Sequence, residues 1–231
     1  MKIRKCLALA TSALFLIGLM STFALAKNEM KDVQDSTNVL KTIMKIPEKG
    51  IPPALLREAQ AIVIVPDVIK GAFIVGGRHG TGVLLVREGN GSWSDPVFVS
   101  LTGGSVGWQV GGTSTDVILV FKNRKGVEGL LKGKFTLGAD AAVAAGPVGR
   151  SAEAATDVML KSEILSYSRS RGLFAGVSLE GAALMVDEDA TDTFYGKKGL
   201  HSSDVLAGKG GKKSHAAREL RALLVKYSST K

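Results

Sequence analysis

The sequence predicts a single α+β domain, in which a strongly curved antiparallel β-sheet of barrel or sandwich type carries peripheral helices. From Ala61 onward, short β-branched runs alternate with glycines, a texture typical of closely spaced strands in a curved sheet. Between Glu163 and Gly181, small and large residues alternate with the two-residue period of a strand. Near both ends of the mature chain, apolar residues instead recur at helical spacing.

The first 26 residues have the pattern of an export leader. A basic start precedes an apolar run from Cys6 to Phe23, and Ala24-Leu25-Ala26 supplies a small-x-small ending. This pattern predicts a secretory signal peptide cleaved before Lys27, with an uncleaved membrane anchor as the alternative. Cys6 is the only cysteine, so the mature chain would form no disulfide and no thiolate metal site. We expect an exported protein, periplasmic or peripheral on the envelope membrane.

Charge is distributed unevenly along the mature chain. Residues 27–196 carry 18 Lys and Arg against 19 Asp and Glu, a balance of −1, whereas residues 197–231 carry 9 against 2, a balance of +7. We therefore expect three parts: a signal peptide over 1–26, a domain over 27–196 and a basic tail over 197–231. A basic excess confined to the tail of an exported protein argues against nucleic acid as a partner. It suits an anionic membrane better.

Helical spacing marks the start of the domain. Residues 27–46 predict a helix with a weak apolar stripe, and Lys31, Lys41 and Lys45 lie elsewhere on its surface. This helix either contacts lipid through the stripe or packs on its own domain. Pro52 and Pro53 end it, and residues 54–60 predict a short second helix. The stripe consists of Met30, Val33, Thr37, Leu40 and Ile43 or Met44.

A series of short strands is predicted next. The first, Ala61 to Val65, is ended by Pro66-Asp67, and the glycine-rich segment 76–82 forms a turn region between strands at 72–75 and 83–86. Asn90-Gly91 is a strong hairpin signal before a strand at 93–99. Strands at 106–110 and 117–121 follow, so that successive short hairpins would form the antiparallel sheet.

The stretch from Leu137 to Gly181 organises the second half of the domain. Strands before and after Arg171-Gly172 predict a hairpin, in which Leu165, Tyr167, Arg169 and Arg171 share one face. Around it we expect a short helix at 125–132, a strand region at 135–145 and a polar loop at 151–159. The acidic run at 187–192 predicts a helix start, because it lacks the glycine and the terminal glutamate of a calcium loop.

The tail predicts a basic amphipathic helix on a flexible linker. The linker is rich in glycine and lysine and includes Lys212 and Lys213. In the helix, over 215–227, an apolar stripe lies opposite Arg218, Arg221 and Lys226. The sequence leaves two roles for this stripe: it docks on the domain, or it contacts a membrane or a partner. The stripe is formed by Ala217, Leu220, Leu223 or Leu224, and Tyr227.

Several blocks resemble the signature segments of the SYLF domain family. They include Leu137 to Asp140, Ala145 to Arg150, Ser166 to Arg169 and Gly172 to Gly181, with further matching blocks upstream from Gly71. The resemblance covers roughly residues 32–196. It implies a lipid-binding domain that favours anionic lipids such as phosphoinositides and phosphatidic acid, and some eukaryotic members also bind actin.

The arginines of these blocks are the first candidates for headgroup contact. Arg169 and Arg171 share a strand face, and guanidinium groups pair with phosphate in a two-pronged geometry. The alternative for them and for Arg150 is an internal ion pair with Asp140, Glu163 or Glu180. The full set of candidate lipid-binding residues is Lys31, Lys41, Lys45, Arg150, Arg169, Arg171, Lys212, Lys213, Arg218 and Arg221.

The sequence offers little support for catalysis. The glycine motifs at 77–82 and 107–112 do not follow a strand and open a helix, as nucleotide loops do. One segment, Gly103 to Gly107, matches Gly-x-Ser-x-Gly, but it leads into the predicted strand at 106–110 and not into the helix that follows a nucleophile elbow, and zinc ligands do not cluster. We therefore expect a non-enzymatic protein with no cofactor and no metal.

Two functions remain in view. The first is binding of anionic phospholipid through basic and amphipathic surfaces, with an affinity that falls as salt rises. The second is an envelope structural or protein-binding module, for which the actin-binding members of the family are a precedent.

Overall fold

A computed structural model describes residues 29–45, 50–72, 75–106, 111–147, 161–170, 173–176, 179–211 and 214–229. The predicted signal peptide and polar loop, together with Arg150, Arg171, Lys212 and Lys213, lie outside the described residues. The strands are β1 Ala61–Ala72, β2 Val75–Val86, β3 Val97–Val106, β4 Gly111–Phe121, β5 Phe135–Thr136, β6 Val143–Ala145, β7 Ile164–Ser170, β8 Leu173–Gly176 and β9 Ala183–Val186. Besides a helix over 29–44, the helices are α2 Pro53–Glu58, α3 Arg124–Leu131, α5 Glu188–Tyr195, α6 Ser202–Leu206 and α7 His215–Ser229.

The described strands form one curled sheet of nine, in the order β5-β9-β3-β2-β1-β4-β7-β6, with β8 paired to β7. Every pairing is antiparallel except β6 with β7, which is parallel. The predicted α+β class with a strongly curved sheet is thus confirmed, with one parallel pair added. The hairpin is confirmed as well, because Ser170 of β7 pairs with Leu173 of β8.

The order of the central strands differs from a run of successive hairpins. β3 pairs with β2, while β4 crosses to the far side and pairs with β1. The resulting order β3-β2-β1-β4 is that of a Greek key. Sequence-local hairpin signals could not reveal this, because nothing in a turn motif states which edge the next strand joins.

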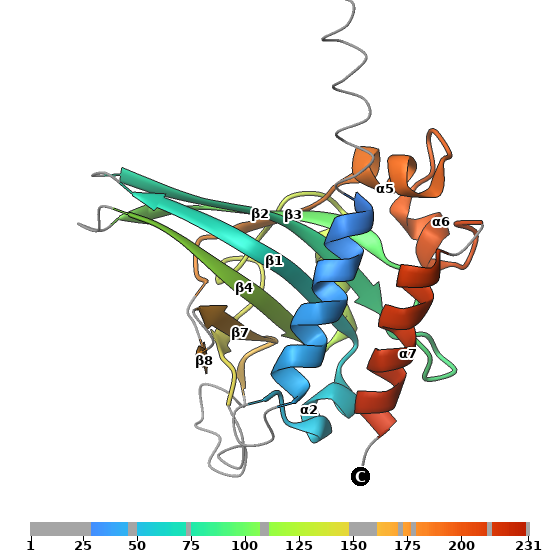
Figure 1. Cartoon of the computed structure of the whole chain (residues 1–231), viewed down its shortest axis with the longest axis horizontal. Helices are drawn as coiled ribbons and strands as arrows, with labels where there is room; N and C mark the ends of the chain where they lie inside the picture. Colours follow the sequence, from blue (N-terminus) through green and yellow to red (C-terminus); the bar gives the residue numbers. More distant parts are fainter. Residues whose placement is uncertain are drawn as a thin grey trace, which may run out of the picture.

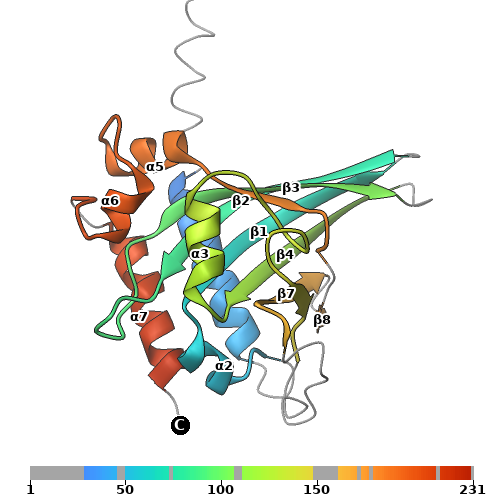
Figure 2. The same ribbon diagram turned by 180° about the vertical axis from the view of Figure 1, so that it is seen from behind.

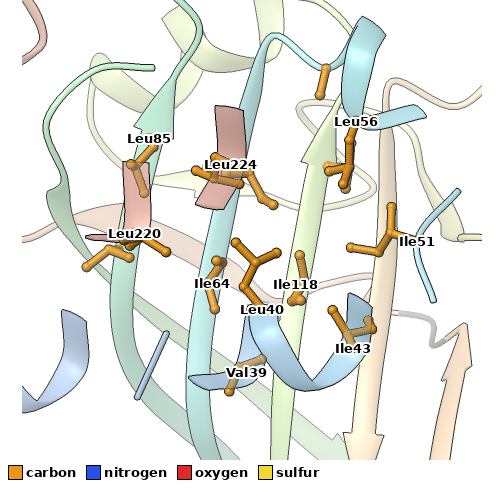
Figure 3. Close-up of a cluster of buried hydrophobic side chains, with 14 of the residues drawn as sticks. Val39, Leu40, Ile43, Ile51, Leu56, Ile64, Leu85, Ile118, Leu220 and Leu224 are labelled. Atoms are coloured by element: carbon orange, nitrogen blue, oxygen red, sulfur yellow. The ribbon is translucent and has the colours of Figure 1, made fainter. Parts of the chain in front are cut away.

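Both faces of the sheet are covered, as Figures 1 and 2 show from opposite sides. On one face lie the 29–44 helix, α2 and α7, which bury Leu40, Ile43, Leu56, Leu220 and Leu224 against the sheet (Figure 3). On the other face lie α3 and the segment that holds β5 and β6. Along β1 the two cores alternate, because Ile62 and Ile64 belong to the first and Ala61, Val63 and Val65 to the second.

Pro66-Asp67 does not end the first strand, contrary to the prediction. β1 continues to Ala72 through a β-bulge between Val65 and Val68, where Asp67 adopts a φ of 48°. The bulge inserts one extra residue in β1, so the strand bends without losing its two partners. Asp67 is held in this conformation by a hydrogen bond from its backbone N–H to Asp116 Oδ1 at 3.1 Å.

The glycine-rich segment 76–82 is likewise strand and not a turn region. β2 runs without interruption from Val75 to Val86. At Gly82 a Cβ atom would lie 2.1 Å from the carbonyl oxygen of Ile64, and at Gly80 it would lie 2.9 Å from side-chain atoms of Val65 and Val68. These glycines therefore permit close backbone approach beside the bulge.

The first residues of several helices are determined by local capping residues and by proline. Pro53 occupies the first turn of α2, as predicted. Asn123 and Asp187 cap α3 and α5 by accepting from the amides of Gly126 and Ala190, at 3.0 and 2.9 Å. Among the described helices, none is long and apolar enough to cross a membrane.

The described part of the predicted flexible linker is folded. α6 lies within it, and Leu200 and Val205 pack on Val97 of β3. Glycines at 196, 199, 208 and 211 adopt positive φ, so they form turns where side chains would be strained. Their abundance in the sequence therefore reflects tight turns in this segment.

Candidate functional site

Both amphipathic helices direct their apolar stripes into the domain. Val33, Leu40 and Ile43 of the 29–44 helix are fully buried, as are Leu220 and Leu224 of α7. Lys41 Nζ joins the two helices through an ion pair with Glu219 Oε1 at 2.5 Å. This ion pair holds the pKa of the Glu219 carboxyl below its ordinary value. Of the alternatives left open by the sequence, the structure shows docking on the domain for both helices.

Of the six described basic residues proposed for lipid contact, five lie on or beside the 29–44 helix and α7, and the sixth, Arg169, lies on β7. Lys31 pairs with Asp35 one turn along its helix, at 2.5 Å. Arg221 donates to the carbonyl oxygen of Trp93 at 2.7 Å and to Asp95 Oδ1 at 3.1 Å. Lys45 and Arg218 are exposed. Lys31, Lys41 and Arg221 are thus engaged in intramolecular contacts, and the two helices that carry them cover the same face of the sheet.

Arg169 forms an internal ion pair, but with an acid that the sequence analysis did not consider. Its Nε and Nη2 atoms lie 2.7 and 2.6 Å from Asp116 Oδ2. The two residues are directly opposite each other in the β4–β7 pairing. The predicted partners Asp140, Glu163 and Glu180 are therefore not the ones in this pair, since strand register decides which acid faces Arg169. Glu163 instead accepts from the side chain of Asn123 at 3.1 Å.

The four central strands extend beyond the rest of the fold. β9 pairs with β3 only as far as Thr102, and β7 pairs with β4 only from Asp116 onward. Residues 68–72, 75–79, 103–106 and 111–115 continue past these points as a four-stranded extension, which we call the projecting ribbon. In both Figure 1 and Figure 2, the projecting ribbon points away from the helices that cover the two faces of the sheet.

The base of the projecting ribbon bears the most exposed large apolar side chain of the described residues. Ile69 of β1 is 65% exposed and is paired with His79 of β2 and Ser114 of β4, whose side chains share its face. Ser114 Oγ donates to Asp67 Oδ1 at 2.8 Å. Single exposed apolar side chains are common on protein surfaces, but covering Ile69 with a partner would remove its apolar area from water, which is favourable.

An acidic notch adjoins Ile69 where the ribbon meets the 29–44 helix. Its volume is about 250 Å³, and its lining includes Asp32, Asp35, Asp67 and Ile69, with Lys31 paired to Asp35. Burial raises the pKa of the Asp32 carboxyl above its ordinary value, although a hydrogen bond from Thr81 opposes the shift. The notch thus presents negative charge beside an apolar side chain.

A second depression, of about 410 Å³, lies between α3, α6 and the β2–β3 turn. Its arginines have structural contacts: Arg87 donates to the carbonyl oxygens of Ala59, Leu56 and Gly91, and Arg124 donates to that of Arg87. Arg87 also stacks over Trp93 at 4.5 Å. Among the described residues, no group of three His, Cys, Asp or Glu side chains is placed to hold a metal ion.

Sequence reasoning missed Ile69 because it placed the end of the first strand at Pro66, and it missed Ser114 because it began a later strand at Val117. A usable signal was present, since β-branched residues and glycines continue without a charged interruption from Gly111 to Thr115. The threonines of this run favour a strand, and the lack of charged residues is unusual for an exposed strand edge.

Comparison with known proteins supports the resemblance seen in the sequence. The family model described as Ysc84, Las17-binding protein actin regulator, matches residues 102–227, which is more than half of the chain. The match extends through α7, in agreement with the place of that helix in the core.

Curated relatives carry related names. SH3 domain-containing YSC84-like protein 1 of Xenopus laevis is 34% identical over 164 residues, covering 71% of this chain and 49% of the relative. Protein YSC84 of Saccharomyces cerevisiae is 38% identical over 165 residues, covering 70% of this chain and 35% of the relative. LAS seventeen-binding protein 3 of the same yeast is 38% identical over 152 residues, covering 64% and 33%. The chain thus spans about a third to a half of these relatives.

Proposed function

Since this chain belongs to the Ysc84 (SYLF) family, we propose that it is a non-enzymatic protein-binding module that receives its partner on the projecting ribbon. The observation that carries the proposal is the exposure of Ile69 on strands that extend beyond their flanking partners. A stable fold has no need of this extension, because both hydrophobic cores lie under the helices and the α3 layer.

The geometry favours a protein partner over a lipid surface. Interfacial helices bind membranes by inserting an exposed apolar face flanked by basic residues. Here the apolar stripes of both candidate helices are buried, and Lys41 and Arg221 are held in intramolecular contacts. Beside Ile69 the charge is negative, which would repel an anionic membrane and attract a basic protein segment.

The names of the relatives point to the same class of partner. YSC84 and LAS seventeen-binding protein 3 belong with a family described as Las17-binding actin regulators. Because this chain spans only part of those proteins, the proposal concerns a protein partner of the shared domain and does not extend to Las17 itself. The family description speaks of binding and regulation, and the name of LAS seventeen-binding protein 3 speaks of binding, which supports a non-enzymatic role.

The test is photo-crosslinking in the producing cell, with p-benzoylphenylalanine in place of Ile69. We expect a discrete protein adduct that mass spectrometry identifies, and a matched probe at exposed Val225 of α7 should not form it. The identified protein, once purified, should bind the wild-type chain and bind Ile69→Asp at least tenfold more weakly. Adducts with phospholipid only, together with binding to phosphatidic acid vesicles and not to neutral ones, would overturn the proposal and restore the lipid function.

Export remains a separate proposal that rests on residues 1–26. A cleaved signal peptide would place the module in the periplasm or on the envelope membrane. Mass spectrometry of the cellular protein should find Lys27 at the amino terminus. Retention of Met1 to Ala26 would instead indicate a membrane anchor.

A further inference from the structure

The outer edge of β4 is open along the projecting ribbon. From Gly111 to Thr115 the strand is paired to β1 on its inner side. On its outer side, the described strands provide no partner before Asp116, which pairs with Arg169 of β7. A strand edge of this kind presents unpaired N–H and C=O groups that another chain can pair with.

The hydrogen bonds at the other end of β4 show which amides point outward. Lys122, just after β4, donates its backbone N–H to the carbonyl oxygen of Glu163 at 2.9 Å, on the β7 side. The bulge in this region lies in β1, since β4 advances two residues while β1 advances three. Amide direction alternates along a strand, so the N–H groups of Ser114 and Gly112 point to the open edge.

Within the described part of the chain, this edge shows none of the devices that usually protect exposed strands. Natural edges carry lysine, proline, inward charges or a covering element. The segment Gly111-Gly112-Thr113-Ser114-Thr115 contains none of these residues, and the nearest acid on the strand, Asp116, is neutralised by Arg169. The opposite edge is less open, because Ala182 packs against Gly103 of β3 just beyond the β9 pairing.

We propose that the outer edge of β4 binds an extended segment of the partner protein by strand addition, on the side of β4 away from β1 and in line with β7. This inference rests on the proposed function and names the kind of partner segment. Main-chain hydrogen bonds would supply affinity, and side chains at alternate positions would supply selectivity.

The surface next to this edge indicates the chemistry of the segment. A residue added opposite Ser114 lies on the same face as Ile69, with only the small serine between them. An apolar β-branched side chain at that position covers Ile69. Asp67, Asp35 and Asp32 lie beside it, so basic residues flanking the apolar position are favoured. The segment is therefore extended, apolar at its centre and positively charged.

The test uses a synthetic peptide, Lys-Thr-Val-Thr-Ile-Thr-Val-Thr-Lys, titrated into ¹⁵N-labelled protein. We expect the amide signals of Gly112 and Ser114 to shift, and those of 117–121, which are paired on both sides, to stay in place. The same peptide N-methylated at every internal residue cannot donate main-chain hydrogen bonds and should not bind. Equal binding of the methylated peptide would overturn strand addition.

Two substitutions at one position provide a matched pair. Ser114→Pro removes the outward N–H while leaving the inner ladder in place, and should weaken peptide binding at least tenfold. Ser114→Ala removes the hydroxyl bond to Asp67 but keeps the N–H, and should bind within about twofold of wild type. Equal binding by Ser114→Pro, with a native spectrum, would contradict the inference. If the Ser114 variants contradict strand addition but crosslinking at Ile69 yields a protein adduct, strand addition at the β4 edge is rejected and the protein-binding function is retained.

Discussion

Arg169 of β7 and Asp116 of β4 face each other across adjacent strands, and both Nε and Nη2 of the arginine contact the one oxygen Oδ2, at 2.7 and 2.6 Å. The other oxygen of Asp116 accepts from the backbone N–H of Asp67 at 3.1 Å. Asp116 is only 7% exposed, so the pair links the hairpin to the β-bulge at the base of the projecting ribbon.

Replacing Arg169 by glutamine should therefore destabilise the fold. Asp116 would keep its charge without a cation, and breaking a buried pair is costly, although the 29% exposure of the arginine side chain reduces the loss. We expect the free energy of unfolding, measured by urea denaturation, to fall by about 1–3 kcal/mol. In the double variant with Asp116→Asn, much of this loss should be recovered. An Arg169→Gln protein of wild-type stability that fails to bind anionic vesicles would instead support headgroup contact.

Leu220→Ala in α7 should lower stability by about 2–5 kcal/mol, the usual cost of truncating a buried leucine. The side chain is fully buried between α7 and the sheet. Val225→Ala provides the control, because Val225 is 45% exposed, and should change stability by less than about 0.5 kcal/mol. Similar losses from both substitutions would mean that α7 does not dock as described.

Gly82→Ala should be among the most damaging small substitutions. Its Cβ would lie 2.1 Å from the carbonyl oxygen of Ile64 and 2.7 Å from Cα of Val65, so backbone must move beside the bulge. We expect a loss of about 3 kcal/mol or more, the upper range for overpacking. Gly89→Ala meets nothing within 4 Å and should be nearly neutral. Thermal melts of the two variants compare them directly.

Asp32→Asn should alter how stability depends on pH. Burial raises the pKa of the Asp32 carboxyl above 3.8, so the folded state favours its protonated form. That contribution is complete below pH 3.8 and is lost as pH rises through the raised pKa. Near neutral pH the variant should be at least as stable as wild type, with a flatter profile above pH 4. Glu58→Gln at an exposed position of α2 is the control, and a variant less stable than wild type at pH 7 would contradict this account.

Local patterns were enough to predict several elements of this protein. Alternation around Arg171-Gly172 predicted the β7–β8 hairpin, Pro53 predicted the start of α2, and stripes of spacing three and four predicted both terminal helices. Such features depend on residues close in sequence, whose periodicity or backbone chemistry acts within a few residues. The family blocks added the expectation of a lipid or protein partner.

Tertiary structure alone decided the features on which the proposed function depends. Whether the stripe of α7 faces lipid or sheet depends on the apolar surface that the distant strands present, and Leu220 and Leu224 bury against it. The partner of Arg169 depends on the β4–β7 register, which links residues 53 positions apart. Among the described strands, Ser114 of β4 pairs only with β1, because the pairing of β4 with β7 reaches no further than Asp116. Strand order and strand length relative to neighbours are set by packing of the whole sheet, and no local pattern encodes them.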